Sequence, residues 1–152
     1  MTRSSFSRRE FLSQSALAAG ASLASWPHLS LAAQNPKAKR PRVAAIFTVL
    51  RFRSHAYNIL ENFLGPYYFR GKLVDPGVEV VSFYADQFPE DDMAKEASAR
   101  FGIPLCKTIE EALCAGGKEL AVDAVLSIGE HGNYAYNDRG QHLYPRKRFF
   151  DE

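Results

Sequence analysis

The sequence predicts an α/β fold, with a parallel sheet of about four strands and helices on its faces. Apolar runs, several of them rich in β-branched residues, read as strands at 42–50, 78–84, 103–106 and 121–128. Between them lie segments of helix-forming residues at 55–64, 91–101 and 109–115, each followed by glycine. Strands that alternate with helices are expected to run parallel, because each helix carries the chain back across the sheet.

The first strand, 42–50, is apolar along most of its length, which predicts a central position in the sheet. A turn at 51–54 follows, and Ser54 is a suitable N-cap for the helix 55–64. Gly65 and Pro66 end that helix, and 67–74 is expected to be a connector. The apolar residues at helical spacing are expected to face the sheet, namely Ala56, Ile59, Leu60 and Phe63.

The second half of the chain has equally clear boundaries. The helix 91–101 starts with two aspartates and stops at Gly102, as the helix dipole and the C-cap favour. Thr108 is the expected cap of the next helix. The run 121–128 is almost entirely apolar, as expected of a strand covered on both faces. A Gly-, Asn- and Tyr-rich loop covers 131–144, and 145–152 is expected to open another helix.

A doubly wound, Rossmann-like sheet usually has the strand order 3-2-1-4-5-6, and this sequence supplies strands one to four, so the fourth strand is expected to be an edge. An apolar edge strand exposes unpaired backbone groups, so we expect a loop, a second copy of the chain or a further part of a longer protein to cover it. The sequence ends with Phe149 and Phe150, which are expected to be exposed, just before Glu152. Residues 42–152 are therefore expected to be an incomplete, truncated Rossmann-like domain.

The first 32 residues are expected to be a signal peptide. Residues 7–12, SRREFL, resemble a twin-arginine export signal, although Ser13 stands where the usual pattern has lysine. An alanine-rich apolar run follows at 15–26, too short to span a membrane, and Ala32 ends a cleavage-type sequence. The signal predicts a periplasmic or otherwise exported protein, with 33–41 as a polar linker and no stable membrane insertion after cleavage.

The charge balance argues against a nucleic-acid partner. The chain has 19 basic and 17 acidic residues, and without residues 1–32 it has sixteen of each. Two basic clusters remain, at 37–42 and 146–148, and are interpreted as a solvated linker and a loop or helix start. Cys106 and Cys114 lie at no metal or redox spacing; buried free thiols are expected, with a disulfide as the alternative in an exported protein.

A family resemblance rests on the middle of the chain. An acidic residue follows the second strand, and the phrases ARFGIP at 99–104, TIEEAL at 108–113 and VDAVL at 122–126 come in order. This succession, over about 42–131, resembles the nucleotide-binding half of the glucose–fructose oxidoreductase-like (Gfo/Idh/MocA) dehydrogenases. The resemblance implies NAD or NADP as cofactor. The family's Glu-Lys-Pro phrase and substrate domain have no counterpart here, so the resemblance implies no catalytic residue and a chain that is inactive alone.

The turn after the first strand departs from that family. Its glycines let the backbone approach a pyrophosphate, but residues 48–55, TVLRFRSH, contain none, so we expect weakened nucleotide binding. Arg51 and Arg53 could instead supply positive charge to an anion, and the backbone amides that follow Ser54 could donate hydrogen bonds to it. The other interpretation is that the two arginines are solvated turn residues without a ligand. The candidate cofactor-binding residues of this turn are Thr48, Arg51, Arg53, Ser54 and His55.

The remaining candidates follow the second and fourth strands. Asp86 stands where the family's acidic residue binds a ribose hydroxyl, although it also reads as a turn aspartate. Gly129, Glu130 and His131 follow the fourth strand, at the edge of the sheet where doubly wound folds bind ligands. Glu130 and His131 are the best polar pair for proton transfer or ligand contact. With His55 they also present metal-binding side chains, but their separation defines no metal motif.

Three functions remain open at this point. The first is an exported oxidoreductase-like protein represented by its NAD(P)-binding-type domain. The second is a non-catalytic exported module that binds a small ligand or a protein, for which Tyr134, Tyr136 and Tyr144 offer contacts. The third is a metal-dependent hydrolase that uses the histidines. Cofactor titration separates the first two, and metal analysis tests the third.

Overall fold

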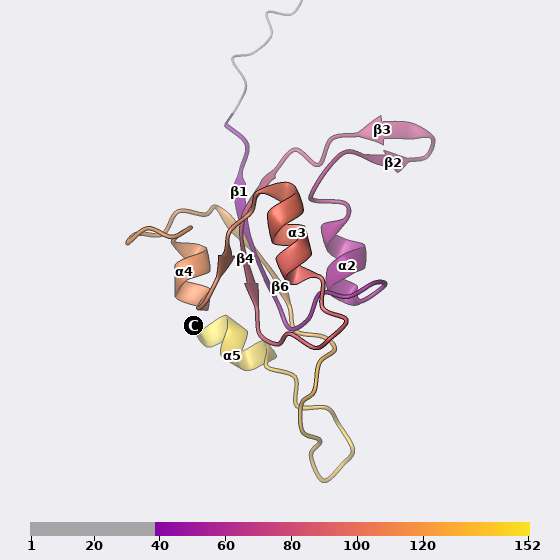
Figure 1. The fold of residues 1–152 in the computed structure, drawn as a ribbon, viewed down its shortest axis with the longest axis vertical. Helices are drawn as coiled ribbons and strands as arrows, with labels where there is room; N and C mark the ends of the chain where they lie inside the picture. Colours follow the sequence, from indigo (N-terminus) through magenta and orange to yellow (C-terminus); the bar gives the residue numbers. More distant parts are fainter. Residues whose placement is uncertain (1–38) are drawn as a thin grey trace, which may run out of the picture. The chain divides into compact units, whose positions relative to one another are not determined.

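The computed structural model describes residues 39–152, so the predicted signal peptide and most of the linker lie outside the described residues. Four parallel strands form one sheet in the order β5-β4-β1-β6, with helices on its faces (Figure 1). This confirms the predicted α/β, Rossmann-like class. The sheet strands are β1 (Arg42–Phe47), β4 (Glu79–Ala85), β5 (Leu105–Cys106) and β6 (Ala124–Ile128). The remaining elements are α2 (His55–Leu60), β2 (Tyr67–Phe69), β3 (Lys72–Val74), α3 (Ala94–Phe101), α4 (Ile109–Leu113) and α5 (Arg146–Asp151).

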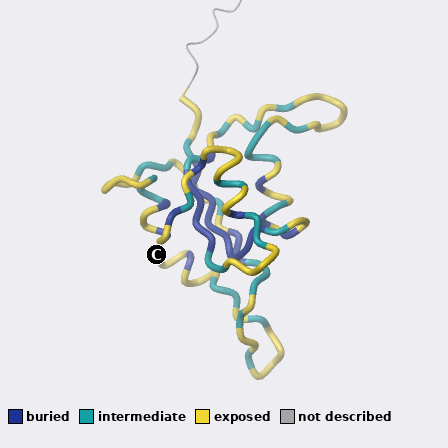
Figure 2. Tube along the Cα trace, viewed as in Figure 1, coloured by how far each residue is buried: buried dark blue, intermediate teal, exposed yellow. Residues whose placement is uncertain are grey.

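β1 is one of the two inner strands of the sheet, as its apolar sequence predicts. It pairs with β4 on one side, from Arg42 opposite Glu79 to Phe47 opposite Ala85, and with β6 on the other. All its residues after Arg42 are buried, and the buried stretch continues through Leu50 (Figure 2). β1 therefore forms the buried centre of the domain.

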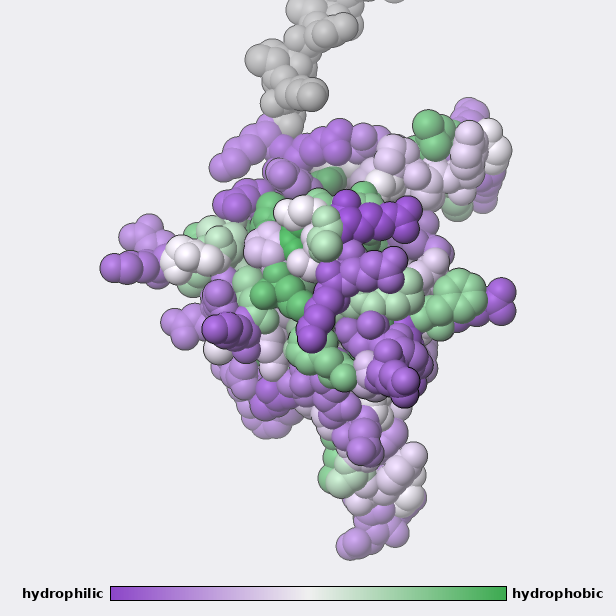
Figure 3. Space-filling model, viewed as in Figure 1, coloured by the Kyte–Doolittle hydropathy of each residue, from purple (hydrophilic) through white to green (hydrophobic). Residues whose placement is uncertain are grey.

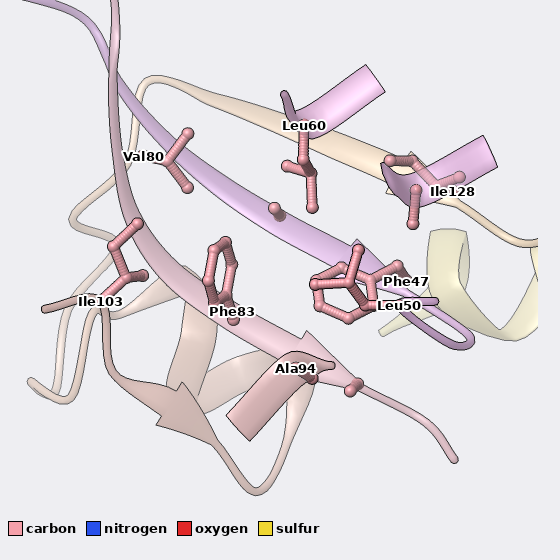
Figure 4. Close-up of a cluster of buried hydrophobic side chains, with 11 residues drawn as sticks. Phe47, Leu50, Leu60, Val80, Phe83, Ala94, Ile103 and Ile128 are labelled. Carbon is pink, nitrogen blue, oxygen red and sulfur yellow. The ribbon is translucent and has the colours of Figure 1, made fainter. Parts of the chain in front are cut away.

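Two apolar clusters cover the two faces of the sheet. The larger joins Phe47 and Phe83 from the strands to Leu60 of α2 and Ala94 of α3 (Figure 4). The rings of Phe47 and Phe83 pack edge to face with centroids 5.7 Å apart. The second cluster lies around Ile46, under α4 and α5. The domain therefore has helix, sheet and helix layers.

The predicted caps are present, but the helices are shorter than the sequence indicates. Ser54 accepts a hydrogen bond from the Tyr57 amide, and Thr108 from the Glu111 amide. Gly102 ends α3 in the left-handed conformation. Residues 91–101 were predicted as helix, but α3 begins at Ala94, and 61–64 form turns after α2. The aspartates before α3 instead belong to the turn, where carboxylates can accept exposed amide hydrogens.

β6 corrects one prediction and confirms another. It is the edge strand, as the expected strand order requires. It is not covered on both faces, however: most of its residues are exposed, and Val125 retains 44% of its accessible surface. Its inner end at Ile128 is buried. An apolar strand sequence does not determine whether both faces of the strand are buried, because burial depends on which other elements pack against it.

Three further local predictions are wrong. The connector 67–74 is a β-hairpin of β2 and β3, and its turn has positive φ at Arg70 (49°) and Gly71 (75°). Ile59 is exposed and does not face the sheet. Phe149 is buried against Tyr84, with only Phe150 exposed as expected.

α5 forms over the predicted C-terminal helix. Cys106 and Cys114 are both free thiols, the first buried and the second half-buried. Within residues 39–152, none of the helices has the length and apolar character needed to cross a membrane.

Candidate functional site

The loops that follow β1, β4 and β6 meet at the carboxyl end of the sheet, and residues 48–55, 86–92 and 129–144 of these loops form the rim. Thr48, directly after β1, joins all three: its amide donates to the Ile128 carbonyl (3.3 Å), and its carbonyl accepts from the Gln87 amide (2.9 Å). Its hydroxyl donates to the carbonyl of Glu130. Thr48 is fully buried, so this candidate residue fixes the loops relative to one another and has no surface for direct ligand contact.

The turn between β1 and α2 uses most of its own amides. The Leu50 amide donates to Asp92 Oδ2 (2.8 Å), and the Arg51 amide donates to Ser54 Oγ (3.3 Å). Ser54 is buried and caps α2. In a glycine-rich nucleotide turn these amides would be free for phosphate. Here a carboxylate and a hydroxyl occupy them, so the residues present do not reproduce that phosphate cradle.

The two arginines of this turn differ in position. The Arg51 guanidinium lies 3.5 Å from Asp91 and borders a cavity. Arg53 has a positive φ of 62°, and its guanidinium lies over the Phe52 ring at 5.1 Å. Of the two guanidinium groups, that of Arg51 is therefore better placed to contact a ligand in this cavity.

His55 and His131 contact each other across the carboxyl end of the sheet. His55 Nδ1 lies 2.8 Å from His131 Nε2, although the two residues are 76 positions apart. The ring planes are 29° apart, and the centroids are separated by 4.9 Å. One imidazole donates and the other accepts, so the pair links the start of α2 to the loop after β6. The sequence placed both residues near this rim, and the structure brings them into contact.

The surroundings of His131 favour its neutral form. Burial lowers the pKa of His131, and the nearby His55 and Arg51 lower it further, while Glu130 acts in the opposite direction. The backbone of His131 is left-handed, with φ of 67°. The next residue, Gly132, has φ of 96°, and a Cβ there would lie 2.7 Å from Tyr134 Cε2. Only glycine fits this position without displacing that ring.

Glu130 is held by an ion pair with Arg146 at the start of α5. Arg146 also donates from Nε to the Gly129 carbonyl (3.2 Å), and a Cβ on Gly129 would lie 2.8 Å from Arg146 Cγ. The side chain of Glu130 is thus directed toward α5. Its role as a proton-transfer partner of His131 is not supported by this geometry.

Asp86 directly follows β4, and its carboxylate accepts hydrogen bonds from two phenol groups and one guanidinium group. Tyr84 Oη (2.8 Å) and Arg148 Nη2 (2.5 Å) reach Oδ1, and Tyr134 Oη (2.6 Å) reaches Oδ2. Burial would raise the pKa of Asp86, but the hydrogen bonds from Arg148, Tyr134 and Tyr84 outweigh it and lower the pKa. Burial, together with the hydrogen bond to Asp86 and its negative charge, raises the pKa of Tyr134. Both oxygens of this carboxylate, for which the family resemblance implies a contact with a ribose hydroxyl, accept hydrogen bonds from the protein itself.

A cavity of about 350 Å³ opens beside these groups, between the loops that follow the three strands. Gln87 fixes one wall, because its side chain exchanges two hydrogen bonds with the Asn133 backbone (2.8 and 3.0 Å). Tyr136 and His142 stack almost parallel, with centroids 4.1 Å apart and planes 8° apart. The cavity is lined by Arg51, Gln87, Pro89, Gly132, Asn133, Tyr134, Tyr136 and His142.

Of the residues predicted to bind a cofactor, only Arg51 lines this cavity, and it is joined there by Tyr134 and Tyr136, which the sequence predicts as contacts of a binding module. Gln87, Asn133 and His142 were not predicted, although a signal for part of the site was present. Aromatic residues alternate at 134, 136, 142 and 144 around an Asn- and Gly-containing turn, which is a short hairpin pattern, and Tyr136 pairs with His142 across it. Gln87 had no signal, because its role depends on a loop 46 residues away.

The metal interpretation gains no support from side-chain grouping. Among the described residues, no group of three or more His, Cys, Asp or Glu side chains is placed to hold an ion. His55 and His131 offer two nitrogens, and Glu130 is engaged with Arg146.

The fold and the rim define a Rossmann-like α/β domain with a ligand-sized cavity at the carboxyl ends of its strands. Comparisons of the chain with models of protein families, with curated proteins and with solved structures found no match.

Proposed function

We propose that this domain is the nucleotide-binding part of an exported oxidoreductase-like protein, and that it binds NAD or NADP without catalysing hydride transfer by itself. The observation that carries the proposal is the cavity at the carboxyl ends of β1, β4 and β6. In open parallel sheets, ligands bind outside the strand ends where the strand order reverses, here between β1 and β6.

The chemistry of the cavity suits a nucleotide. Arg51 offers a guanidinium for a phosphate group, and the Tyr136 ring, 65% exposed and backed by His142, offers a stacking surface for a base. A volume of about 350 Å³ lies at the lower end of the range for small-molecule sites. We infer that the cavity holds one nucleotide half, with the other half extending along the rim toward His55 and His131.

The same geometry sets an upper limit on affinity. Asp92 and Ser54 occupy the amides of Leu50 and Arg51, and Asp86 is held by its own network. A phosphate at the turn would meet a carboxylate and would gain few backbone donors. We therefore expect binding weaker than micromolar, dependent mainly on Arg51.

A second candidate function is a non-catalytic exported module that binds another small ligand or a protein partner. The aromatic group of the loop 131–144 favours it: beyond the Tyr136–His142 stack, His142 and Tyr144 have centroids 4.5 Å apart, and those of Tyr134 and Tyr144 are 6.0 Å apart. Rigid aromatic side chains supply contact area at little entropic cost, whatever the ligand.

Calorimetric titration of the full chain with NAD(H) and NADP(H), with thermal melts in parallel, tests the proposal. We expect saturable binding, a higher melting temperature and a dissociation constant about tenfold higher for Arg51→Ala, as for loss of one charge-assisted contact. The matched control is Arg139→Ala. Arg139 belongs to the loop 131–144 but does not line the cavity, so this variant should bind the cofactors as the wild type does.

Binding that is unchanged in Arg51→Ala would contradict the proposed position of the phosphate. A folded protein that ignores both cofactors would favour the second candidate function. A micromolar or tighter dissociation constant would contradict the expected effect of the occupied amides.

A further inference from the structure

The β2–β3 hairpin, residues 67–74, forms an arm that is separate from the four-stranded sheet. Its strands pair only with each other, in the register Tyr67 to Val74, Tyr68 to Leu73 and Phe69 to Lys72. It extends away from the sheet beyond the end of α2 (Figure 1). A two-stranded hairpin is marginally stable alone in water, so an arm of this kind benefits from a surface to pack on.

The arm exposes large apolar side chains on both of its faces. Tyr68 (77% exposed) and Leu73 (62%) lie opposite each other, and Phe69 (57%) points to the other face. Apolar groups are visible at the surface of the arm in Figure 3. Arg70 and Lys72 are its charged residues, and the stretch 65–74 contains no acidic residue. The arm is therefore both apolar and cationic, a composition typical of an interaction surface.

A groove of about 260 Å³ lies next to the arm, between α2 and α3. Leu60, Leu64 and Met93 are among its apolar lining residues. Glu61 and Glu96 also border it, against Arg100 alone as a basic residue, so the groove is apolar with a net acidic margin. Apolar grooves with charged rims accept aromatic anchors from partners.

The groove and the arm are adjacent in the chain, because Gly65 lines the groove and the arm begins two residues later. Tyr68, Phe69 and Leu73 of the arm are exposed and none of them lines the groove, so the arm does not fill the groove of its own chain. The two surfaces match in polarity and are opposite in charge. A two-fold axis near residues 65–66 would bring each arm to the groove of the other copy.

We propose that two copies of this chain associate by reciprocal exchange of the arm, with an aromatic side chain of each arm in the α2–α3 groove of its partner. Arg70 and Lys72 then lie near Glu61 and Glu96 of the other copy. The inference is independent of the proposed nucleotide site, whose cavity shares no lining residue with this groove.

Sedimentation velocity of the full chain over a series of concentrations tests the exchange. The wild type is expected to show a monomer–dimer equilibrium. The double variant Tyr68→Ser, Leu73→Ser removes the anchors and should raise the dimer dissociation constant by at least about tenfold, as truncated hot spots do. Ala97→Arg, which blocks the groove, should act similarly. Circular dichroism and thermal melts establish that each variant is folded.

Mixing distinguishes this arrangement from other dimers. The arm variant retains its groove and the groove variant retains its arm, so an equimolar mixture should form heterodimers through one intact contact. Glu96→Lys should weaken the dimer, because it places two positive charges opposite each other. Adding Lys72→Glu to the same chain should restore part of the affinity, because the two residues then again carry opposite charges.

Controls come from surfaces elsewhere on the domain. Val125→Lys on the edge strand β6 and Phe150→Ser on α5 should leave the dimer unchanged. A wild type that is monomeric at every concentration would overturn the proposal. So would a dimer that only Val125→Lys disrupts, because this would assign the contact to the sheet edge.

Discussion

Gly132 shows how a single residue shapes the rim. Its φ of 96° lies in the region that L side chains rarely adopt, and an added Cβ would also meet Tyr134 and Gln87. Both neighbours form the wall of the cavity. The absence of a side chain at this position is therefore what allows the loop after β6 to close onto the loop after β4.

Gly132→Ala is predicted to lower the free energy of unfolding by about 1–3 kcal/mol, because the backbone strain and the contact with Tyr134 add together. Urea unfolding measures the loss. Gly140→Ala is the matched control: its φ is 72°, but a Cβ there has open space. The control should lose less, and equal losses in both variants would show that the close contact with Tyr134 has no effect.

Asp86 is the second residue on which the rim depends. Asp86→Asn is predicted to cost about 1–3 kcal/mol, because an amide nitrogen replaces an acceptor and leaves a phenol or the Arg148 guanidinium poorly paired. The side chain of Asp86 is only 12% exposed, so solvent does not compensate fully. Asp151→Asn, which breaks an exposed pair with Lys147, should have a much smaller effect.

The effect of Asp86 should also depend on pH. Its folded pKa lies below the ordinary value of 3.8, so its contribution is present above pH 3.8 and is lost as the pH falls through the folded pKa. The difference between wild type and Asp86→Asn should therefore shrink in acid. A difference that stays constant down to strongly acidic pH would contradict the charged network.

At the scale of elements, the His55–His131 contact joins α2 to the loop after β6. Arg51 and Glu130 are the charged groups that act on it, with opposite signs. Because the folded pKa of His131 is below 6.5, the unfolded chain binds more protons at this site just below pH 6.5. Stability from the neutral pair is thus present above pH 6.5 and is lost as the pH falls toward the folded pKa.

His131→Asn should remove this part of the pH dependence, because asparagine does not titrate and tolerates the left-handed backbone at this position. Melting temperatures measured from neutral pH to below pH 6.5 test this prediction. His142→Asn, which leaves the pair intact, should keep the fall seen in the wild type. The same slope in wild type and His131→Asn would show that the pair does not contribute.

Elements with local signals could be predicted from the sequence. Ser54, Thr108 and Gly102 mark helix ends because capping depends on a few neighbouring residues. The arm was missed because its turn, Arg70-Gly71, lacks the usual Asn-Gly pair, and its strands have only three residues each. The exposure of β6 could not be predicted, because it depends on which elements stand beside it.

At the scale of the whole molecule, parallel topology explains both the success and the limit of the site prediction. Strand order placed the candidates after β1 and β6 on one rim, and His55 and His131 do meet there. The partners of Asp86 could not be predicted, because Tyr134 and Arg148 reach it from 48 and 62 residues away. Those contacts depend on the path of a loop, which local sequence preferences do not determine.

A ¹H–¹⁵N NMR titration of the full chain with NAD(H) and NADP(H) tests most directly whether a nucleotide binds at the carboxyl ends of the strands. We expect concentration-dependent shifts at Arg51, Gln87 and Tyr136, around the cavity, and unchanged signals in the arm at 67–74. Shifts confined to the α2–α3 groove, or no shifts at saturating cofactor, would contradict a nucleotide site at the carboxyl ends of the strands.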